Sequence, residues 1–159
     1  MGVEIERKFL VKSTECTRGI NGMFYRQGYF IREAHIHARV RIVGDKTILT
    51  FKGPPKDLRR AEFEFEIPYY DGVQMIDELC GDYIVEKTRY TLEHKKHIWV
   101  IDIFHGSNSG LILAEIELMA AEEEFEQPDW LGEEVTHDAR YINANLAEFP
   151  YNTWAEERL

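Results

Sequence analysis

The chain has 159 residues, which is enough for one domain with a hydrophobic core of its own. Its 29 acidic and 19 basic side chains give a formal net charge of -10, and this acidic excess argues against nucleic-acid binding through a broad basic face. No segment approaches the run of about 18 apolar residues that spans a bilayer, and the first residues are charged where a signal peptide is apolar, so we expect no membrane association and a cytoplasmic location.

Eight segments alternate apolar and polar residues, the pattern of β-strands that bury one face. They span residues 3–11, 24–34, 36–43, 47–53, 60–67, 83–92, 97–104 and 111–119. One helix is expected at 72–80, capped by Asp71, and a second after Thr136. We expect a single domain over 1–159, in which 120–159 forms an acidic connector followed by a C-terminal helical tail.

A long series of strands with few helices predicts an α+β fold that is mainly β, with an antiparallel sheet closed into a barrel or folded into a sandwich. The two cysteines, Cys16 and Cys80, lie far apart in the sequence and form no CxxC motif. We therefore expect both to be free thiols in a reducing compartment.

The polar face of these strands carries charges grouped by sign. Side chains at positions i and i+2 of a strand point to the same side, so Arg39 lies beside Arg41, and Glu115 beside Glu117. The acids on this face are Glu4, Glu6, Glu62, Glu64, Glu66, Asp102, Glu115 and Glu117, and the bases are Lys8, Arg39, Arg41, Lys52, Arg60, Lys87 and Arg89. A solvated outer face explains any one strand, but like charges repel each other, so the whole set favours a shared interior.

Such an interior suits a metal ion and a chain of phosphates. Clustered carboxylates bind hard divalent cations such as Mg²⁺ or Mn²⁺, and clustered arginines and lysines bind phosphoryl oxygens. The first and last predicted strands become neighbours if the sheet closes, which would bring Glu4 and Glu6 to Glu115 and Glu117. The apolar side of the sheet would then face outward and be covered by helices, by connecting segments or by a second copy in a homodimer.

Several motifs in this order resemble the CYTH family, also called the triphosphate tunnel metalloenzymes. The opening Glu4-Ile5-Glu6-Arg7-Lys8 matches the family's ExExK strand. Further matches are Gln27-Gly28-Tyr29, Arg39-x-Arg41, Leu49-Thr50-Phe51-Lys52, Arg60-x-Glu62-x-Glu64, Glu86-Lys87-Thr88-Arg89-Tyr90, Asp102-x-Phe104, Ala114-Glu115-Ile116-Glu117-Leu118 and Pro128-x-Trp130-Leu131-Gly132. They cover nearly the whole chain.

The resemblance implies an eight-stranded antiparallel tunnel with a polar, charged lumen and a few covering helices, which binds a triphosphate with Mg²⁺ or Mn²⁺. The expected metal-site residues are Glu4, Glu6, Glu62, Glu64, Asp102, Glu115 and Glu117. The expected phosphate-binding residues are Lys8, Tyr29, Arg39, Arg41, Lys52, Arg60, Lys87 and Arg89. Among all of these, Lys8, Glu4, Glu115 and Lys87 are expected to act in catalysis.

Membership of this family leaves the reaction open. The short bacterial members are most similar to the chain and imply hydrolysis of inorganic tripolyphosphate, a small-molecule substrate, to pyrophosphate and phosphate. An adenylyl cyclase of the class IV type and a thiamine triphosphatase are the alternatives from the same family. A third alternative is a module that binds polyphosphate or a nucleotide without turnover.

Overall fold

The structure is a computed structural model that describes residues 5–56 and 59–155. It confirms a mainly antiparallel β architecture. The strands are β1 Ile5–Val11, β2 Met23–Glu33, β3 Ile36–Val43, β4 Lys46–Lys56, β5 Arg59–Glu66, β6 Ile84–His94, β7 His97–Phe104, β8 Ile112–Leu118 and β9 Leu131–Glu134. The helices are α1 Tyr69–Leu79, α2 Asn143–Glu148 and α3 Tyr151–Trp154, with short 3₁₀ turns at Thr14–Thr17, Gly106–Asn108 and Ala139–Tyr141.

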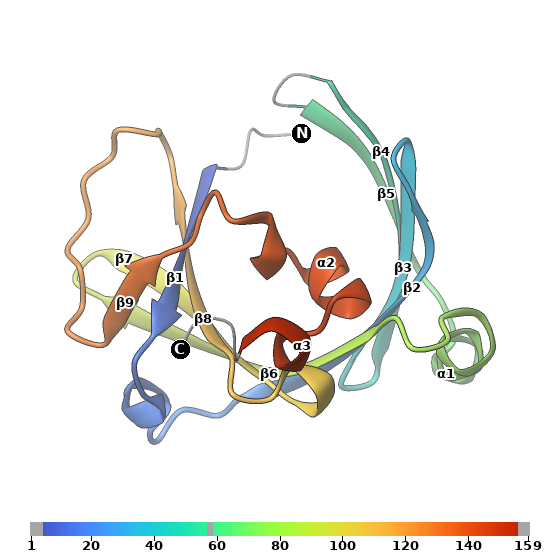
Figure 1. The fold of residues 1–159 in the computed structure, drawn as a ribbon, viewed down its shortest axis with the longest axis horizontal. Coiled ribbons are helices and arrows are strands. Elements are labelled where there is room, and N and C mark those ends of the chain that lie inside the picture. Colours follow the sequence, from blue (N-terminus) through green and yellow to red (C-terminus); the bar gives the residue numbers. More distant parts are fainter. Residues whose placement is uncertain (1–4, 57–58, 156–159) are drawn as a thin grey trace.

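The nine strands form one curved sheet in the order β5-β4-β3-β2-β6-β7-β8-β1-β9 (Figure 1). β1 pairs with β8 in antiparallel register, so Glu6 lies opposite Glu117 and Lys8 opposite Glu115. This pairing confirms that the first strand and the last long strand are neighbours. Within the described residues the series of pairings ends at β5 on one side and β9 on the other.

The ninth strand is a difference from the eight that the sequence predicts. β9 has only four residues and contains Gly132, so it shows too little alternation to be recognised from its sequence. A Cβ at Gly132 would lie 3.0 Å from the carbonyl oxygen of Leu10, which explains why a glycine stands where this strand meets β1.

Helix α1 covers the outer face of β2, β3 and β4. It begins at Tyr69 after Pro68, so Asp71 lies in its first turn and is not the cap that the sequence predicts. Its buried residues are Gly72 and Ile76. The close contact extends to Cys80 just beyond the helix, because a Cβ at Gly28 of β2 would lie 2.6 Å from the sulfur of Cys80.

The connector before β9 covers the outer face of β1, β7 and β8. Phe125 and Trp130 from this connector contact Trp99, with ring centroids 5.7 and 5.4 Å apart, and Trp99 is fully buried. Arg7 donates from Nε to Glu134 at 2.8 Å on the same side of the sheet. The apolar outer face is therefore covered by α1 over β2, β3 and β4 and by the connector over β1, β7 and β8, as expected from the sequence for helices and connecting segments. Phe63 and Phe65 of β5 stay exposed.

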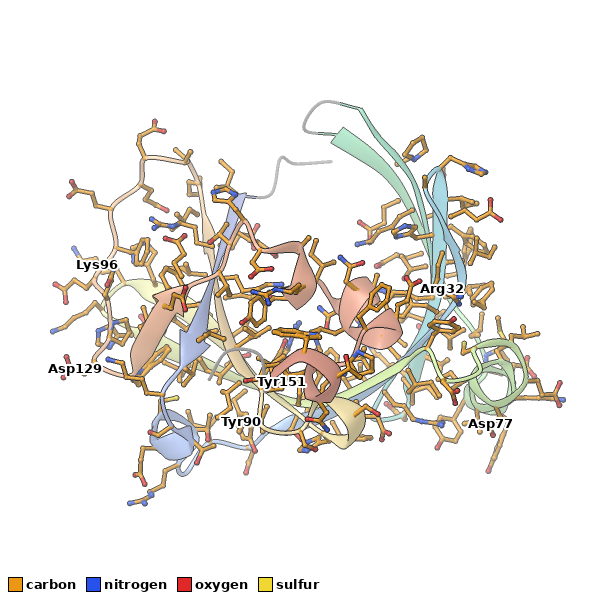
Figure 2. The ribbon with its side chains drawn as sticks, viewed as in Figure 1. Arg32, Asp77, Tyr90, Lys96, Asp129 and Tyr151 are labelled. Carbon is orange, nitrogen blue, oxygen red and sulfur yellow. The ribbon has the colours of Figure 1, made fainter. Side chains whose placement is uncertain are left out.

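The C-terminal segment lies on the concave side of the sheet, where α2 and α3 lie inside the arc (Figure 1). Tyr141, Leu146 and Trp154 pack there against inward-facing apolar residues of the strands, among them Phe104 and Leu113. Figure 2 accordingly shows Tyr151 on the inner side of the arc, and Asp77, Lys96 and Asp129 at its outer edges. The single helix predicted after Thr136 is instead a 3₁₀ turn and two short helices, because Pro150 ends the helical conformation between them.

No helix in the described part of the chain has the length and apolar character needed to cross a bilayer. Cys16 and Cys80 are both free thiols, as the sequence predicts.

Candidate active site

The concave side of the sheet holds a cavity of about 590 Å³ between the strands and the C-terminal segment. Its walls come from β1–β6 and β8, so residues far apart in the sequence meet there. The charged and tyrosine side chains that line it are Glu6, Lys8, Tyr29, Arg39, Arg41, Lys52, Glu62, Glu64, Arg89 and Glu115. Most of the residues predicted from the charge pattern therefore share one cavity.

Two arginines of β3 form the centre of its basic wall. Because Arg39 and Arg41 are two residues apart, both point inward, while Val40 between them is fully buried on the α1 side. Burial, together with the neighbouring charges of Arg39 and Arg89, lowers the pKa of Arg41 to about 10. The buried Nε of Arg39 has no hydrogen-bond partner among the described residues.

The ring of Tyr25 on β2 contacts three cations of this basic wall. The guanidinium carbons of Arg89 and Arg41 lie 4.9 and 5.4 Å from the centre of its ring, and Nζ of Lys87 lies 5.8 Å away. Such cation–π contacts hold three positive charges close together without neutralising them.

Lys87 and Asp102 form a buried ion pair beneath the cavity. Their side chains are 0% and 2% exposed, and Nζ of Lys87 donates to Oδ2 of Asp102 at 2.9 Å. Arg89 donates to both oxygens of the same carboxylate, each at 2.8 Å. Burial would raise the pKa of Asp102, but the two cations outweigh it and hold that pKa below its usual range. Burial also lowers the pKa of Lys87 to about 8, against the opposing charge of Asp102.

The sequence predicts Asp102 as a metal ligand, whereas in the structure its partners are Lys87 and Arg89. Both of its carboxylate oxygens already accept hydrogen bonds from cations. The geometry therefore favours a role for Asp102 in ordering Lys87 and Arg89, and metal binding by Asp102 remains an untested prediction.

The carboxylates of β1 and β8 form the opposite side of the cavity. Nζ of Lys8 lies 3.4 Å from Oε1 of Glu115, and Glu6 is directly opposite Glu117, which is exposed. Cross-strand partners have Cβ atoms about 5 Å apart, within reach of a shared cation. Residues 5–56 and 59–155 contain no group of three His, Cys, Asp or Glu side chains arranged to hold a metal. The pair Glu6 and Glu117 fits two ligands of such a site, and Glu4, the expected third, lies outside the described residues.

The edge strand β5 adds Glu62 and Glu64 to the cavity. Glu62 lies opposite Lys52, and Glu64 lies opposite Thr50, on the adjacent strand β4. Arg60, which the sequence analysis places on the same face, lies where the side chains fall outside the described part of the structure. The cavity therefore has acidic residues on both sides of its basic wall.

The C-terminal segment reaches two lysines of the site. Nζ of Lys8 donates to the carbonyl oxygen of Tyr141 at 3.0 Å, and Nζ of Lys87 donates to Oδ1 of Asn143 at 3.2 Å. Residues 142–145 line the cavity itself. This segment thus fills the apolar part of the space inside the sheet and forms one wall of the charged cavity.

Several polar residues of this region were given no role from the sequence, among them Tyr25, Gln27 and Asn143. Tyr25 and Gln27 share the inward face of β2 with Tyr29, and Gln27 lies directly opposite Arg41. The alternation along β2 could have identified both of these residues. Asn143 could not have been found in this way, because no strand pattern leads to the C-terminal segment.

Comparison with known proteins gives a family and near relatives. The model of the CYTH domain matches residues 2–148. The chain is 41% identical over 156 residues to a protein of Acetivibrio thermocellus named inorganic triphosphatase, covering 98% of this chain and all of that protein. It is 36% identical over 148 residues to an inorganic triphosphatase of Nitrosomonas europaea, covering 91% of this chain and 96% of that protein.

A solved structure shows the same fold. The crystal structure of the inorganic triphosphatase NE1496 superimposes with a TM-score of 0.75 at 33% sequence identity, covering 92% of this chain and 95% of that chain. The shared fold therefore covers most of the chain.

Proposed function

The chain belongs to the CYTH family, and from this premise we propose that it is a hydrolase that cleaves inorganic tripolyphosphate to pyrophosphate and phosphate. The observation that carries the proposal is the cavity, in which Arg39, Arg41, Lys52 and Arg89 face a common space with carboxylates beside them. Two relatives of the chain that share more than a third of its residues are named inorganic triphosphatases.

The basic residues would hold the phosphoryl oxygens. Hydrolysis breaks a bond between phosphorus and a bridging oxygen when a water oxygen attacks, and negative charge develops on the bridging oxygen as it leaves. Fixed cations that already lie around this position stabilise that charge without reorganising. In the proposal Arg39, Arg41 and Lys52 bind the phosphates directly. Lys87 and Arg89 add positive charge at the same wall of the cavity. Glu115, beside Lys8, orients the attacking water.

A divalent cation completes the proposed site. Glu6 and Glu117, together with Glu4, are the residues that would hold Mg²⁺ or Mn²⁺, and Glu62 and Glu64 are the candidates for a second ion. When bound, such an ion neutralises part of the phosphate charge. The choice between the two metals stays a prediction, as does the cytoplasmic location.

A phosphate-release assay tests the proposed reaction. Tripolyphosphate, thiamine triphosphate, ATP and pyrophosphate are compared with and without Mg²⁺ and Mn²⁺, and cyclic AMP is measured in the ATP samples. We expect the highest kcat/KM with tripolyphosphate and no activity in excess chelator. Faster release from thiamine triphosphate, or cyclic AMP as the main product, would reassign the substrate, and binding without turnover would make the protein a binding module.

A matched pair of variants connects the activity to the cavity. Arg41→Met removes a cation from the basic wall, whereas Arg18→Met removes one from the surface, where the side chain of Arg18 is 78% exposed. We expect kcat/KM to fall at least tenfold in Arg41→Met, because a charged hydrogen bond to phosphate is lost, and to stay within twofold in Arg18→Met. Equal activities in the two variants would place the reaction elsewhere.

The homodimer expected from the sequence also remains a prediction. Phe63 and Phe65 on the outer face of β5 are 60% and 53% exposed and are the residues that a second copy would cover. Sedimentation velocity tests it, and a single species at 18.7 kDa at all concentrations would rule it out.

A further inference from the structure

Gln27 is a fully buried amide that lies behind two residues of the cavity. Its exposed fraction is 0%, and it does not line the cavity itself. It lies directly opposite Arg41 in the pairing of β2 with β3, and Tyr29 follows it on the same face of β2. A polar side chain in such a position needs partners for both ends of its amide.

The two ends of the Gln27 amide have different partners. Nε of Arg41 donates to Oε1 of Gln27 at 3.0 Å, and Nε2 of Gln27 donates to the hydroxyl oxygen of Tyr29 at 2.9 Å. An arginine side chain has donors and no acceptor, so only the oxygen of the amide can face Arg41. The amide nitrogen must then face Tyr29, and the orientation of Gln27 is fixed by chemistry.

This orientation determines what the Tyr29 hydroxyl can do. Its oxygen accepts the hydrogen bond from Gln27, which leaves the hydroxyl proton to be donated elsewhere. Gln27 is the one hydrogen-bond partner of this hydroxyl among the described residues, and Tyr29 lines the cavity. Most phosphate oxygens of a polyphosphate are ionised at neutral pH and act as acceptors, so a hydroxyl that is committed to donating suits them.

We propose that Gln27 is a positioning residue that commits the Tyr29 hydroxyl to donate to a phosphate oxygen and holds Arg41 toward the same substrate. The proposal rests on the proposed function, since it requires a phosphate chain in the cavity. Gln27 itself touches no substrate and acts through its two neighbours.

A double-mutant cycle separates this role from a purely structural one. Tyr29→Phe, Gln27→Met and the double variant are compared by kcat and KM for tripolyphosphate at saturating Mg²⁺. Tyr29→Phe is expected to lower kcat/KM about tenfold, because a hydrogen bond to a charged acceptor is lost. In the wild type, Gln27→Met should lower kcat/KM by about tenfold or more. In the Tyr29→Phe background the factor by which Gln27→Met lowers kcat/KM should be smaller by about threefold or more. An equal factor in both backgrounds would overturn the proposal, because a structural defect does not depend on the Tyr29 hydroxyl.

A second variant keeps the test valid if Gln27→Met folds poorly. The carboxylate of Gln27→Glu still accepts from Arg41 but, when ionised, cannot donate to Tyr29. Its added charge weakens phosphate binding equally in both backgrounds, so this effect cancels in the cycle, and the same threefold difference is expected. Equal factors would again overturn the proposal.

Thr47→Val is the matched control for changing a buried polar group. Thr47 is 1% exposed, its hydroxyl has no hydrogen-bond partner in the described part of the chain, and its side chain faces Gly72 of α1 on the far side of the sheet. Its kinetic constants should stay within twofold of the wild type. Thermal unfolding of all variants confirms that each is folded at the assay temperature.

A binding measurement distinguishes failure of this inference from failure of the proposed function. If the wild type releases no phosphate from tripolyphosphate, the proposed function falls, and the cycle is repeated on dissociation constants for tripolyphosphate by calorimetry without divalent cations. Coupling between Gln27 and Tyr29 in those constants would support the inference independently of turnover. Additive losses, or no binding by the wild type, would overturn it.

Discussion

The carboxylate of Asp102 binds Lys87 and Arg89 together, although the three residues come from two strands that are joined by a turn. Nζ of Lys87 lies 2.9 Å from Oδ2 of Asp102, and both side chains are almost completely excluded from solvent. Asp102 is thus the counter-ion of two cations that the proposal directs toward phosphate. A buried charge that loses the counter-ion to which it is hydrogen-bonded is strongly destabilising.

Replacing Asp102 with asparagine should destabilise the protein and disable the site together. We expect Asp102→Asn to lower the free energy of unfolding by about 3–5 kcal/mol, as measured by urea denaturation. The exposed Asp129 provides the control, and Asp129→Asn should change this free energy by less than about 0.5 kcal/mol. Loss of the carboxylate also removes the charge that raises the pKa of Lys87 against burial, so more of Lys87 becomes neutral at pH 7. Similar unfolding curves for the two variants would contradict this account.

The dependence of activity on Mg²⁺ distinguishes an ordering role of Asp102 from metal binding. Glu117→Gln removes one of the two paired carboxylates of β1 and β8 and should raise the Mg²⁺ concentration for half-maximal activity about tenfold or more. Asp102→Asn, assayed where it is folded, should leave that concentration within threefold while lowering kcat/KM. A similar rise in both variants would make Asp102 a metal ligand after all.

The C-terminal segment should contribute to stability like any buried core element. Leu146 is 0% exposed and packs inside the sheet, so we expect Leu146→Ala to lower the free energy of unfolding by about 2–5 kcal/mol. Ile98 is 62% exposed on β7, and Ile98→Ala should cost less than about 1 kcal/mol. Equal costs in urea denaturation would mean that the segment is not packed inside the sheet in solution.

The ion pair of Arg7 with Glu134 should stabilise the folded chain at neutral pH and lose this effect in acid. The hydrogen bond from Arg7 lowers the pKa of Glu134 from 4.5 to about 2, so the ionised carboxylate is favoured in the folded chain. Its contribution is complete above the unfolded pKa of 4.5 and is lost as the pH falls from there toward 2. Because both side chains are about one-third exposed, solvent screening limits the contribution to about 0.5–1 kcal/mol.

Comparison of the wild type with Glu134→Gln measures this contribution. The wild type should be the more stable of the two by that amount at pH 7, and the difference should shrink toward zero between about pH 4.5 and pH 2. Thermal unfolding over this pH range is the measurement. A difference that grows in acid would mean that the carboxylate is not stabilised by Arg7.

The strands could be predicted because their apolar and polar residues alternate with a period of two. The charged residues then showed which face of each strand lines the cavity. Arg39 and Arg41, for example, line the cavity as the spacing requires. The apolar part of the inward face was not predicted. Val85 shares the inward face of β6 with Lys87, but an apolar residue in an alternating strand does not show which side is enclosed.

Neutral polar residues were harder to predict than charged ones. Gln27 and Asn143 carry no charge pattern, and each acquires its importance from side-chain contacts. Gln27 bonds to Arg41 and Tyr29, and Asn143 bonds to Lys87. The contact of Asn143 joins residues 56 positions apart and depends on how the C-terminal segment folds back inside the sheet. Local sequence patterns do not show that the C-terminal segment folds back inside the sheet at this position.

The most direct measurement is a crystal structure of the chain with tripolyphosphate in the absence of divalent cations. The account predicts phosphate oxygens within hydrogen-bonding distance of the guanidinium groups of Arg39 and Arg41. Tripolyphosphate bound only on the outer face of the sheet, with the concave cavity holding water alone, would contradict it.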